Sequence, residues 1–387
     1  MRAAVSRVVS QIVTSPTLRG WSRGRHALWR VLTGGRPTVH YFHQPDDPYS
    51  HLAVQALPAL KARYRIALEV HVVSAPDQAA APEAAMLRAF AERDAQVLAK
   101  GLQWPPKGLG DPVALPSASQ EALAQGDALR RRLGHYLGAM FYFEGEWYWG
   151  LDRLAFLEER LAPFRVKGAP SAPIAPRLEV RLGAVAASSR KPVLHAFISF
   201  RSPYTYLSIP RLRALADHYG AELRLRFVLP MVMRGLPVPR AKQLYILTDC
   251  KREAERLGLP FGKVADPVGA GAERGLAVLH HAIPAGQGPA FAQSFLSGVF
   301  AEGIDAASDA GLASLATRAG VSASIVKAAL ADPSWRDVVE ANRREMFGGG
   351  AWGVPSFRVN EGATHWGQDR LWAVEQDLQR ALAGGLS

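Results

Sequence analysis

Hydrophobic and polar positions along the chain predict two successive blocks with the same order of elements. Short apolar or alternating runs indicate strands, whereas apolar positions spaced by three or four residues indicate helices. In the first block these patterns predict a strand at 38–42, a helix at 48–64, a strand at 66–73, helices at 82–100 and 119–132, strands at 139–144 and 146–149, and a helix at 151–161. The first block therefore has the order β-α-β, a helical insertion, and β-β-α.

The second block repeats this order. Its patterns predict a strand at 193–200, a helix at 203–219, a strand at 221–229, a helical region at 240–346, a hairpin formed by 356–360 and 363–366, and a helix at 368–382. Two short sequences also recur, because Asp47-Pro48-Tyr49-Ser50 matches Ser202-Pro203-Tyr204-Thr205, and Trp149-Gly150-Leu151-Asp152-Arg153-Leu154 matches Trp366-Gly367-Gln368-Asp369-Arg370-Leu371. A repeat of both pattern and residues indicates two fused copies of one domain.

The order of elements predicts an α/β protein with two tandem thioredoxin-like domains, each with an inserted helical subdomain. The stretch between the two blocks contains Pro170, Pro173 and Pro176 among Ser and Ala residues, which is typical of a linker. We therefore divide the chain into an N-terminal extension at 1–35, a first domain at 36–164, a linker at 165–190 and a second domain at 191–387.

Composition and charge narrow the class of protein. With 387 residues, of which 48% are hydrophobic and 21% charged, the chain is long enough for two globular cores. The net charge of +12 comes mostly from scattered arginines, and we find no zinc-binding spacing, helix-turn-helix or RNA-binding aromatic motif, so we expect no nucleic-acid partner. Cys250 is the only cysteine, which excludes an intrachain disulfide and predicts a reducing, cytoplasmic location.

The N-terminal extension is basic and amphipathic. Val5, Val8, Val9 and Ile12 recur at helical spacing, and the first acidic residue of the chain is Asp46. Three interpretations remain open: a helix packed on the first domain, a contact with a membrane surface, or an organellar presequence. We favour the first interpretation.

Ser202 begins the first helix of the second block directly after a strand. Serine is a preferred N-cap and Pro203 suits the first helical position, so the serine hydroxyl is expected in the positive field of the helix N-terminus. Val354-Pro355 stands just before a later strand of the same block. Taken separately, the first motif is an ordinary helix cap and the second an ordinary turn.

Taken together, the motifs of the second block resemble a known family. Ser202-Pro203-Tyr204-Thr205-Tyr206-Leu207, Gly353-Val354-Pro355 and Trp366-Gly367-Gln368-Asp369-Arg370 are similar, in this order, to motifs of the 2-hydroxychromene-2-carboxylate isomerases and kappa-class glutathione transferases, relatives of the DsbA oxidoreductases. The resemblance covers residues 191–382. It implies a DsbA-type thioredoxin fold, in which the proline of the Val-Pro step is usually cis and faces the start of the first helix.

The resemblance also implies a glutathione site. Ser202 would hydrogen-bond the glutathione sulfur and hold it as a thiolate, while Val354 and Pro355 would bind the cysteinyl backbone. Gln368 and Asp369 would meet the γ-glutamyl end of the ligand. A helix N-terminus with a serine hydroxyl supplies the positive potential and the hydrogen bond that lower a thiol pKa.

The implied activity is that of a glutathione-dependent isomerase or transferase acting on a small aromatic or conjugated substrate. A thiolate would add to a conjugated double bond, allow rotation and leave, with glutathione regenerated. The predicted substrate contacts are Arg201, Tyr204 and Arg234. Lys242 resembles a family lysine that reaches the ligand, although a solvated helix lysine is an equal alternative.

The first block departs from these motifs. Asp47 takes the position of Ser202, and Met140 takes the position of Pro355 if Gly138 aligns with Gly353. A carboxylate beside the glutathione sulfur would repel a thiolate, so we interpret the first domain as a degenerate copy.

Three histidines of the first block, His40, His43 and His51, occur near Asp46 and Asp47. We interpret them as ordinary surface histidines because strand and helix geometry separates them, and we predict no metal site.

A second class of function is also open. The chain would then be a non-catalytic thioredoxin-fold protein that binds peptides or partner proteins along the Val354-Pro355 edge. A thiol–disulfide oxidoreductase is disfavoured because neither block has a cysteine at the start of its helix. We expect either a monomeric pseudo-dimer of the two copies or a homodimer of the chain.

Overall fold

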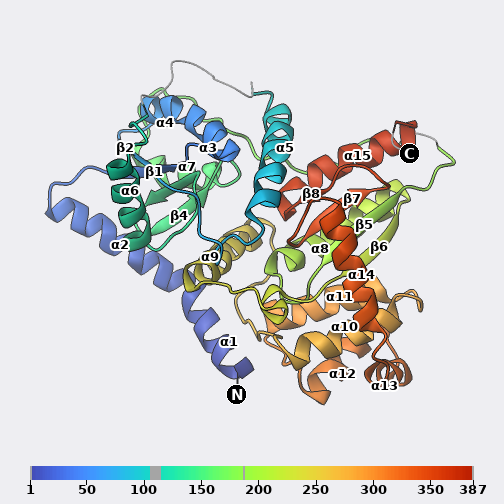
Figure 1. Ribbon diagram of the computed structural model, residues 1–387. Coiled ribbons are helices and arrows are strands. Elements are labelled where there is room, and N and C mark those ends of the chain that lie inside the picture. The colour runs from blue at the N-terminus through green and yellow to red at the C-terminus, as the bar shows by residue number, and fades with distance from the viewer. Residues whose placement is uncertain (1, 105–114, 186–187, 386–387) are drawn as a thin grey trace. The chain divides into compact units, whose positions relative to one another are not determined.

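The computed structural model describes residues 2–104, 115–185 and 188–385. The chain divides into two compact units (Figure 1). The N-terminal unit comprises Pro16–Leu178 and Pro239–Tyr245, and the C-terminal unit comprises Met1–Ser15, Glu179–Val238 and Ile246–Ser387. The first helix of the chain therefore groups with the C-terminal unit, and a short segment after residue 238 groups with the N-terminal unit.

The N-terminal unit is built on a four-stranded sheet of order β2-β1-β3-β4. Its strands are β1 (Thr38–His43), β2 (Ala67–Val72), β3 (Met140–Phe143) and β4 (Glu146–Trp149). β2 is parallel to β1, whereas β3 and β4 are antiparallel to their neighbours. Its helices are α2 (Pro16–Leu32), α3 (Pro48–Ala53), α4 (Leu57–Arg63), α5 (Ala84–Leu102), α6 (Gln120–Leu133) and α7 (Leu154–Leu161), with 3-10 turns at Val54–Ala56 and Ala162–Phe164. The core joins Tyr41 and Phe141 of the sheet to Leu57 and Leu157 of the helices.

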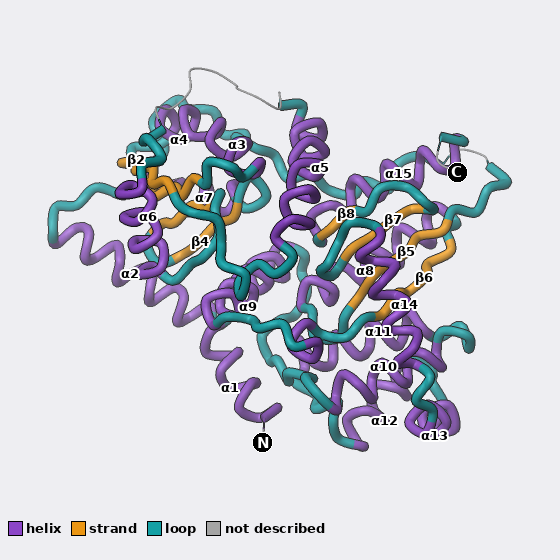
Figure 2. The backbone as a smooth tube through the Cα atoms, in the orientation of Figure 1, coloured by secondary structure: helices purple, strands orange, loops and turns teal. Residues whose placement is uncertain are grey.

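The C-terminal unit has its own sheet of order β6-β5-β7-β8, whose strands lie side by side in Figure 2. The strands are β5 (Val193–Ile198), β6 (Glu222–Phe227), β7 (Ser356–Val359) and β8 (His365–Trp366). The helices are α1 (Arg2–Val13), α8 (Pro203–Tyr219), most of α9 (Arg240–Arg256), α10 (Ala270–Ala282), α11 (Gly288–Ser297), α12 (Asp309–Arg318), α13 (Ala323–Ala331), α14 (Trp335–Gly348) and α15 (Leu371–Ala383), with 3-10 turns at Met231–Arg234 and Gln368–Arg370 and a short π-helix at Gly298–Glu302. Helices α10 to α13 gather in one block in Figure 1.

The two sheets share strand order, strand directions and register. Thr38 pairs with Ala67 in the first sheet and Val193 pairs with Glu222 in the second, so each residue of β1 and β2 has its counterpart 155 positions later. The insertion between the second and third strands is larger in the C-terminal unit, where α9 to α14 stand in the place of α5 and α6.

The N-terminal extension forms two helices rather than one. α1 ends at Val13, and Pro16 begins α2. The hydroxyls of Ser6 and Ser10 on α1 donate to the backbone oxygens of Val264 and Gly262 at 2.6 and 2.8 Å, so α1 is tied to the C-terminal unit. Packing on the first domain, the interpretation that we favoured, therefore applies to α2 alone. Among the helices that the structure describes, none is both long enough and apolar enough to cross a bilayer.

Candidate active site

The turn from β5 into α8 places Ser202 at the start of the helix, as predicted. Ser202 is the N-cap, its Oγ accepts a hydrogen bond from Thr205 N at 3.2 Å, and Pro203 is the first helical residue. Because Oγ already accepts from a backbone amide, the hydroxyl proton remains to be donated elsewhere. The hydroxyl donates to Val354 O in a long bond of 3.5 Å, so the serine combines a helix N-terminus with a weakly engaged donor.

The Val354-Pro355 step lies against this turn. The peptide bond between the two residues is cis, as the resemblance implies. Ser202 Oγ lies 3.5 Å from Val354 O, although the two residues are 152 positions apart in the sequence. Pro355 O accepts from Gly367 N at 2.8 Å, which attaches the third motif to the second. The fold thus brings the three predicted motifs together.

Gln368 lies beneath the site rather than at its surface. Its side chain is buried, and its amide donates to Glu253 Oε2 at 3.2 Å and to Asp369. Its oxygen accepts from Arg211, whose pKa burial lowers to about 10. Gln368 is therefore held in a charged network, whereas Asp369 is half-buried in the 3-10 turn just before α15.

Arg201 is engaged by a carboxylate of its own unit. Its guanidinium donates two hydrogen bonds to Asp266, each 2.7 Å long. Asp266 is itself held, because its backbone N–H donates to Ser6 Oγ at 2.9 Å. Arg234, the other arginine that we predicted as a substrate contact, ends the 3-10 turn after β6 and is half-buried.

Tyr204 hydrogen-bonds a buried aspartate. Its hydroxyl donates to Asp249 Oδ2 at 2.8 Å, and Asp249 also lies 3.7 Å from Arg252. The N-terminal unit contains the same pair, because the Tyr49 hydroxyl donates to Asp94 Oδ2 at 2.7 Å. In both units the tyrosine follows the cap by two residues and the aspartate follows the tyrosine by 45, so the pair fixes the first inserted helix against the capped helix.

Replacing either tyrosine by phenylalanine should therefore have the same effect on its own unit. Tyr204→Phe removes one hydrogen bond to a buried carboxylate that keeps its arginine, so we expect the free energy of unfolding to fall by about 1.5–3 kcal/mol. Tyr49→Phe should cost a similar amount. Chemical denaturation of the two variants checks this, and a cost confined to one of them would contradict the equivalence of the two pairs.

Lys242 belongs to the N-terminal unit. It lies in the first turn of α9, and its Nζ donates to the backbone oxygen of Ala80 at 2.9 Å. Burial lowers the pKa of Lys242 to about 8, since the ammonium loses hydration. The Lys242 ammonium is therefore bound by a backbone carbonyl, and Lys242 is not a solvated helix lysine.

Stability should consequently depend on the charge of Lys242. Between about pH 8 and 10.5 the unfolded chain keeps a proton that the folded chain has lost, so the free energy of unfolding should rise with pH over this interval. Lys242→Met should remove most of the rise in denaturation measured at the two ends of the interval. Lys61→Met, at an exposed position of α4, is the matched control and should keep it; an unchanged rise in Lys242→Met would show that burial does not perturb this lysine.

The corresponding turn of the N-terminal unit is built differently. Asp47 caps α3 by accepting from Tyr49 N at 3.3 Å and Ser50 N at 2.9 Å, and burial raises the pKa of its carboxyl. The Ser50 hydroxyl donates to Asp47 and accepts from Ala139 N at 2.9 Å. A carboxylate thus stands where the C-terminal unit has a hydroxyl.

The counterpart of Pro355 is Ala139, so our alignment of Met140 with Pro355 was wrong by one residue. Met140 pairs with Trp149 in the first sheet as Ser356 pairs with Trp366 in the second. Ala139 O also accepts from Gly150 N at 2.8 Å, as Pro355 O accepts from Gly367 N. The N-terminal unit therefore lacks the proline, but Ala139 rather than Met140 replaces it.

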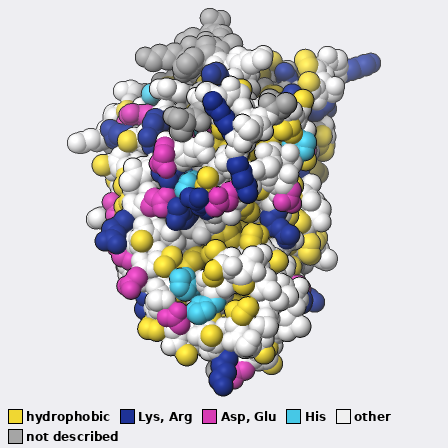
Figure 3. All heavy atoms as spheres, turned by 90° about the vertical axis from the view of Figure 1, so that its right-hand side faces the viewer, with side chains coloured by type: hydrophobic (Ala, Val, Ile, Leu, Met, Phe, Trp, Pro, Cys, Tyr) yellow, Lys and Arg dark blue, Asp and Glu magenta, His cyan; other side chains and the backbone are white. Residues whose placement is uncertain are grey.

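A cavity of about 350 Å³ opens elsewhere in the C-terminal unit. It is lined by Phe227 of β6, by His280, His281 and Ile283 at the end of α10, and by Asn342 of α14. Figure 3 shows a face on which histidine and hydrophobic side chains lie together and acidic and basic side chains are interspersed. None of the predicted site residues lines this cavity.

The residues that sequence analysis missed are those that hold the site together. Asp266, Arg211 and Glu253 pair with Arg201 and Gln368 across 65, 157 and 115 positions, and no local pattern signals such contacts. The tyrosine–aspartate pair did leave a signal, since the same spacing of 45 residues occurs in both blocks.

Comparisons with known proteins agree with this geometry. Residues 193–379 match the family model of the DSBA-like thioredoxin domain. No curated protein matches the chain. Among solved structures, a 2-hydroxychromene-2-carboxylate isomerase is 22% identical over 49% of this chain and 95% of its own, with a TM-score of 0.41.

Two further structures are disulfide oxidoreductases by name. The cytosolic disulfide reductase DsbM from Pseudomonas aeruginosa is 22% identical over 49% of this chain and 97% of its own, with a TM-score of 0.39, and has also been solved with GSH. The oxidoreductase DsbA from Xylella fastidiosa is 15% identical over 51% and 90%, with a TM-score of 0.34. At these identities and scores the structures carry no conclusion about activity. Residues 193–379 thus match the model of the DSBA-like thioredoxin domain, and their sheet order and capped helix are those of a thioredoxin-like fold.

Proposed function

We propose that the C-terminal unit binds glutathione and holds it as a thiolate for isomerisation or transfer on a small aromatic or conjugated substrate. One observation carries the proposal: the Ser202 hydroxyl, at the N-terminus of α8, lies 3.5 Å from the oxygen of Val354 in the cis Val354-Pro355 step. An extended peptide placed along that step would bring its cysteinyl sulfur toward the hydroxyl. The helix N-terminus would favour the negative charge of the sulfur.

The chemistry follows from these groups. The thiolate would form a carbon–sulfur bond with the conjugated double bond of the substrate, and the displaced electron pair would move onto the substrate carbonyl as an enolate. The former double bond could then rotate, the enolate would collapse, and the carbon–sulfur bond would break to return the thiolate. Ser202 would donate its hydroxyl proton in a hydrogen bond to the sulfur whenever the sulfur is charged.

Disulfide chemistry has less support from the chain itself. Neither Ser202 nor Asp47 can form a disulfide, and Cys250 is buried within α9. A reduced thiol cofactor and a single buried cysteine both suit the cytoplasm, where we propose that the protein acts.

Two of the predicted substrate residues hydrogen-bond carboxylates close to the turn around Ser202. Arg201 and Tyr204 are held by Asp266 and Asp249, so we propose that they position the turn around Ser202 rather than contact the substrate. We propose Arg234 as the contact for a substrate carboxylate, because it stands on the turn that directly follows β6.

We further propose that the two units arose by tandem duplication and that the first lost the glutathione site. The shared offset of 155 residues in the first two strands, the equal sheet orders and the paired tyrosine–aspartate contacts support the duplication. Asp47 and Ala139 in place of Ser202 and Pro355 support the loss.

Calorimetric titration of the full chain with reduced glutathione tests the function. We expect one binding site per chain and an ultraviolet thiolate band that S-methylglutathione, which has no ionisable thiol, does not produce. Binding without the band would favour the non-catalytic peptide-binding alternative. Absence of binding would reject the glutathione site altogether.

A further inference from the structure

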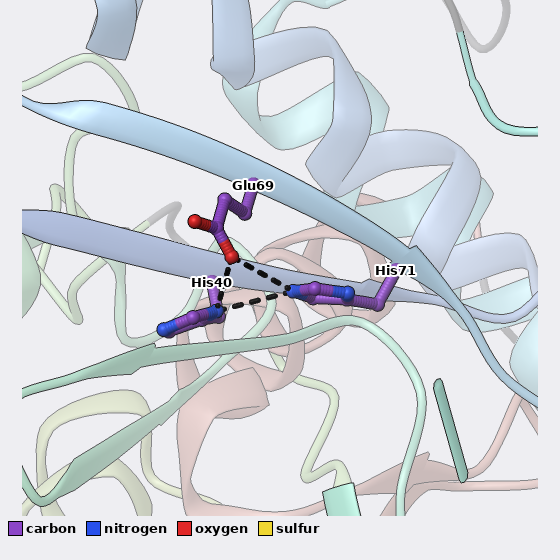
Figure 4. A group of neighbouring side chains, drawn as sticks. All are labelled: His40, Glu69 and His71. Atoms are coloured by element: carbon purple, nitrogen blue, oxygen red, sulfur yellow. Dashed lines mark hydrogen bonds and ion pairs between the residues drawn. The ribbon is translucent and has the colours of Figure 1, made fainter. Parts of the chain in front are cut away.

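Three side chains on β1 and β2 of the N-terminal unit converge on one point (Figure 4). His40 of β1 lies opposite Glu69 of β2, and His71 follows Glu69 by two residues, so all three side chains point to the same face of the sheet. His40 Nδ1 lies 3.1 Å from His71 Nε2 and 3.2 Å from Glu69 Oε2, and His71 Nε2 lies 3.7 Å from the same oxygen.

These separations match the edges of a metal coordination tetrahedron. Histidine nitrogen and carboxylate oxygen bind Zn²⁺ at about 2.0–2.2 Å, which places neighbouring ligand atoms roughly 3.4 Å apart. Each of the three atoms can offer a lone pair to the common point. A single proton shared between the two imidazoles would satisfy two of the three atoms, whereas one cation would satisfy all of them.

The surroundings suit an accessible ion. The His71 ring stacks on Phe42 at 5.2 Å between centroids, and Tyr142 lies 6.0 Å from His40, so neighbouring rings restrain both imidazoles. The side chain of Glu69 is 53% exposed, which leaves one side of the group open to solvent. An ion could enter from that side and keep a water molecule in its fourth position.

At the equivalent positions of the C-terminal sheet, an arginine side chain supplies the positive charge. The counterparts of His40 and His71 are His195 and Arg226. Arg226 Nε donates to His195 Nδ1 at 3.3 Å, and Glu345 completes the group at 3.5 Å from Arg226 and 3.7 Å from His195. A guanidinium therefore balances a carboxylate beside the histidine in one unit, whereas the other unit has a second imidazole in its place.

We propose that His40, Glu69 and His71 bind one divalent first-row transition-metal ion, with Zn²⁺ the best match to two imidazoles and one carboxylate. β2 is the edge strand of its sheet, so the ion would clamp this edge to β1. The proposal is independent of the glutathione site. It departs from our sequence-based expectation of no metal, which grouped His40 with His43, although residues three apart on a strand face opposite sides.

Titration of tag-free, chelator-treated full-length protein with Co²⁺ tests the site. We expect visible absorption bands of a four-coordinate ion that saturate at one equivalent and disappear when Zn²⁺ is added. His71→Ala should weaken binding by more than the roughly 10–100-fold that loss of an outer-sphere partner costs. Glu69→Gln, at a mostly exposed position that tolerates substitution, should weaken it as well.

Two matched histidine variants control the experiment. His51→Ala removes an exposed histidine of the same unit, and His281→Ala disrupts the other group of His and Asp side chains in the described residues, His280, His281 and Asp332. Both should keep the bands of the wild type. Absence of bands in the wild type, or their loss in His281→Ala but not in His71→Ala, would overturn the proposal.

A second surface carries an independent inference. α2 has no buried residue and contacts its unit through arginines, since Arg23 pairs with Glu146 at 2.8 Å and Arg30 pairs with Glu144. Its other side carries exposed residues at three- and four-residue spacing: Trp21, Arg25, Leu28, Trp29 and Leu32. Both tryptophans are about two-thirds exposed, at 67% and 68%. The helix thus packs by its charged side, and its apolar residues Trp21, Leu28, Trp29 and Leu32 are exposed to solvent.

We infer that this apolar side docks on an anionic membrane surface. Tryptophan prefers the membrane–water interface, and Arg25 within the stripe and Arg36 beyond it, both exposed, would meet lipid headgroups. The wild-type protein should float with phosphatidylglycerol-containing vesicles, whereas the double variant Trp21→Ser/Trp29→Ser should remain unbound. The control Leu330→Ser, at an exposed apolar position of α13, should float as the wild type does. Equal flotation of the double variant, or self-association of the wild type without vesicle binding, would contradict the inference.

Discussion

Replacing Ser202 by alanine should sharply reduce thiolate formation by bound glutathione while the protein stays folded. The Ser202 Oγ accepts from Thr205 N and donates to Val354 O over 3.5 Å, a long hydrogen bond that one to the ligand sulfur would replace. A hydrogen bond to a charged group contributes about 1.5–3 kcal/mol, so losing it should lower the thiolate fraction at neutral pH about 10–100-fold. The thiolate band of the glutathione complex measures this fraction directly, and turnover of a conjugated aromatic carboxylate should fall with it.

Two variants separate this role from helix capping. Ser202→Asp keeps a capping side chain, as Asp47 caps α3, but places a negative charge beside the sulfur, so it should lose the thiolate without losing the helix. Ser322→Ala removes the cap of α13, whose oxygen accepts from Ile325 N at 3.3 Å, and should cost about 1 kcal/mol of stability with no change in the thiolate. A thiolate band of normal strength in Ser202→Ala would show that the serine is only a cap.

Much of the fold was predictable because local patterns specify it. The strands at 38–43 and 193–198 and the helix at 203–219 were predicted to within two residues, since apolar runs and a Ser-Pro start are local signals. The region 240–346 was predicted only as helical. Its division into α9 to α14 depends on breaks such as Gly269 and Ser308 and on packing among the helices, which a periodic pattern does not record.

The site was predictable in its motifs but not in its connections. The helix cap at Ser202, the Val354-Pro355 step and the turn before α15 each have a local sequence signature. The fold brings the three motifs together. The alignment of Met140 with Pro355 failed because strands have a period of two, and a shift of one residue is decided by cross-strand pairing rather than by similarity of letters. The ion pair between Arg201 and Asp266 could not be predicted for a similar reason, because the two residues come into contact only in the folded chain.

Replacing Gly353 by alanine should disturb the same site from its other side. A Cβ atom at this position would lie 2.8 Å from Cε2 of Trp366 and closer still to Cζ2, which is inside van der Waals contact. The Trp366 ring cannot easily swing away, because it packs edge-on against Trp352 at 5.1 Å and its backbone pairs with Ser356. The loop that carries Val354 and Pro355 must then move instead. Overpacking of this kind costs about 1–3 kcal/mol.

The expected result is therefore a lower melting temperature of the C-terminal unit together with weaker glutathione binding. A change of about 1.4 kcal/mol in the free energy of binding would raise the dissociation constant tenfold. Gly348→Ala is the matched control, because a Cβ atom at the end of α14 meets nothing within 4 Å. Both measurements should be unchanged in that variant. If Gly353→Ala lowered the melting temperature without weakening glutathione binding, the Val354-Pro355 step would support the fold of the domain but would not hold the ligand.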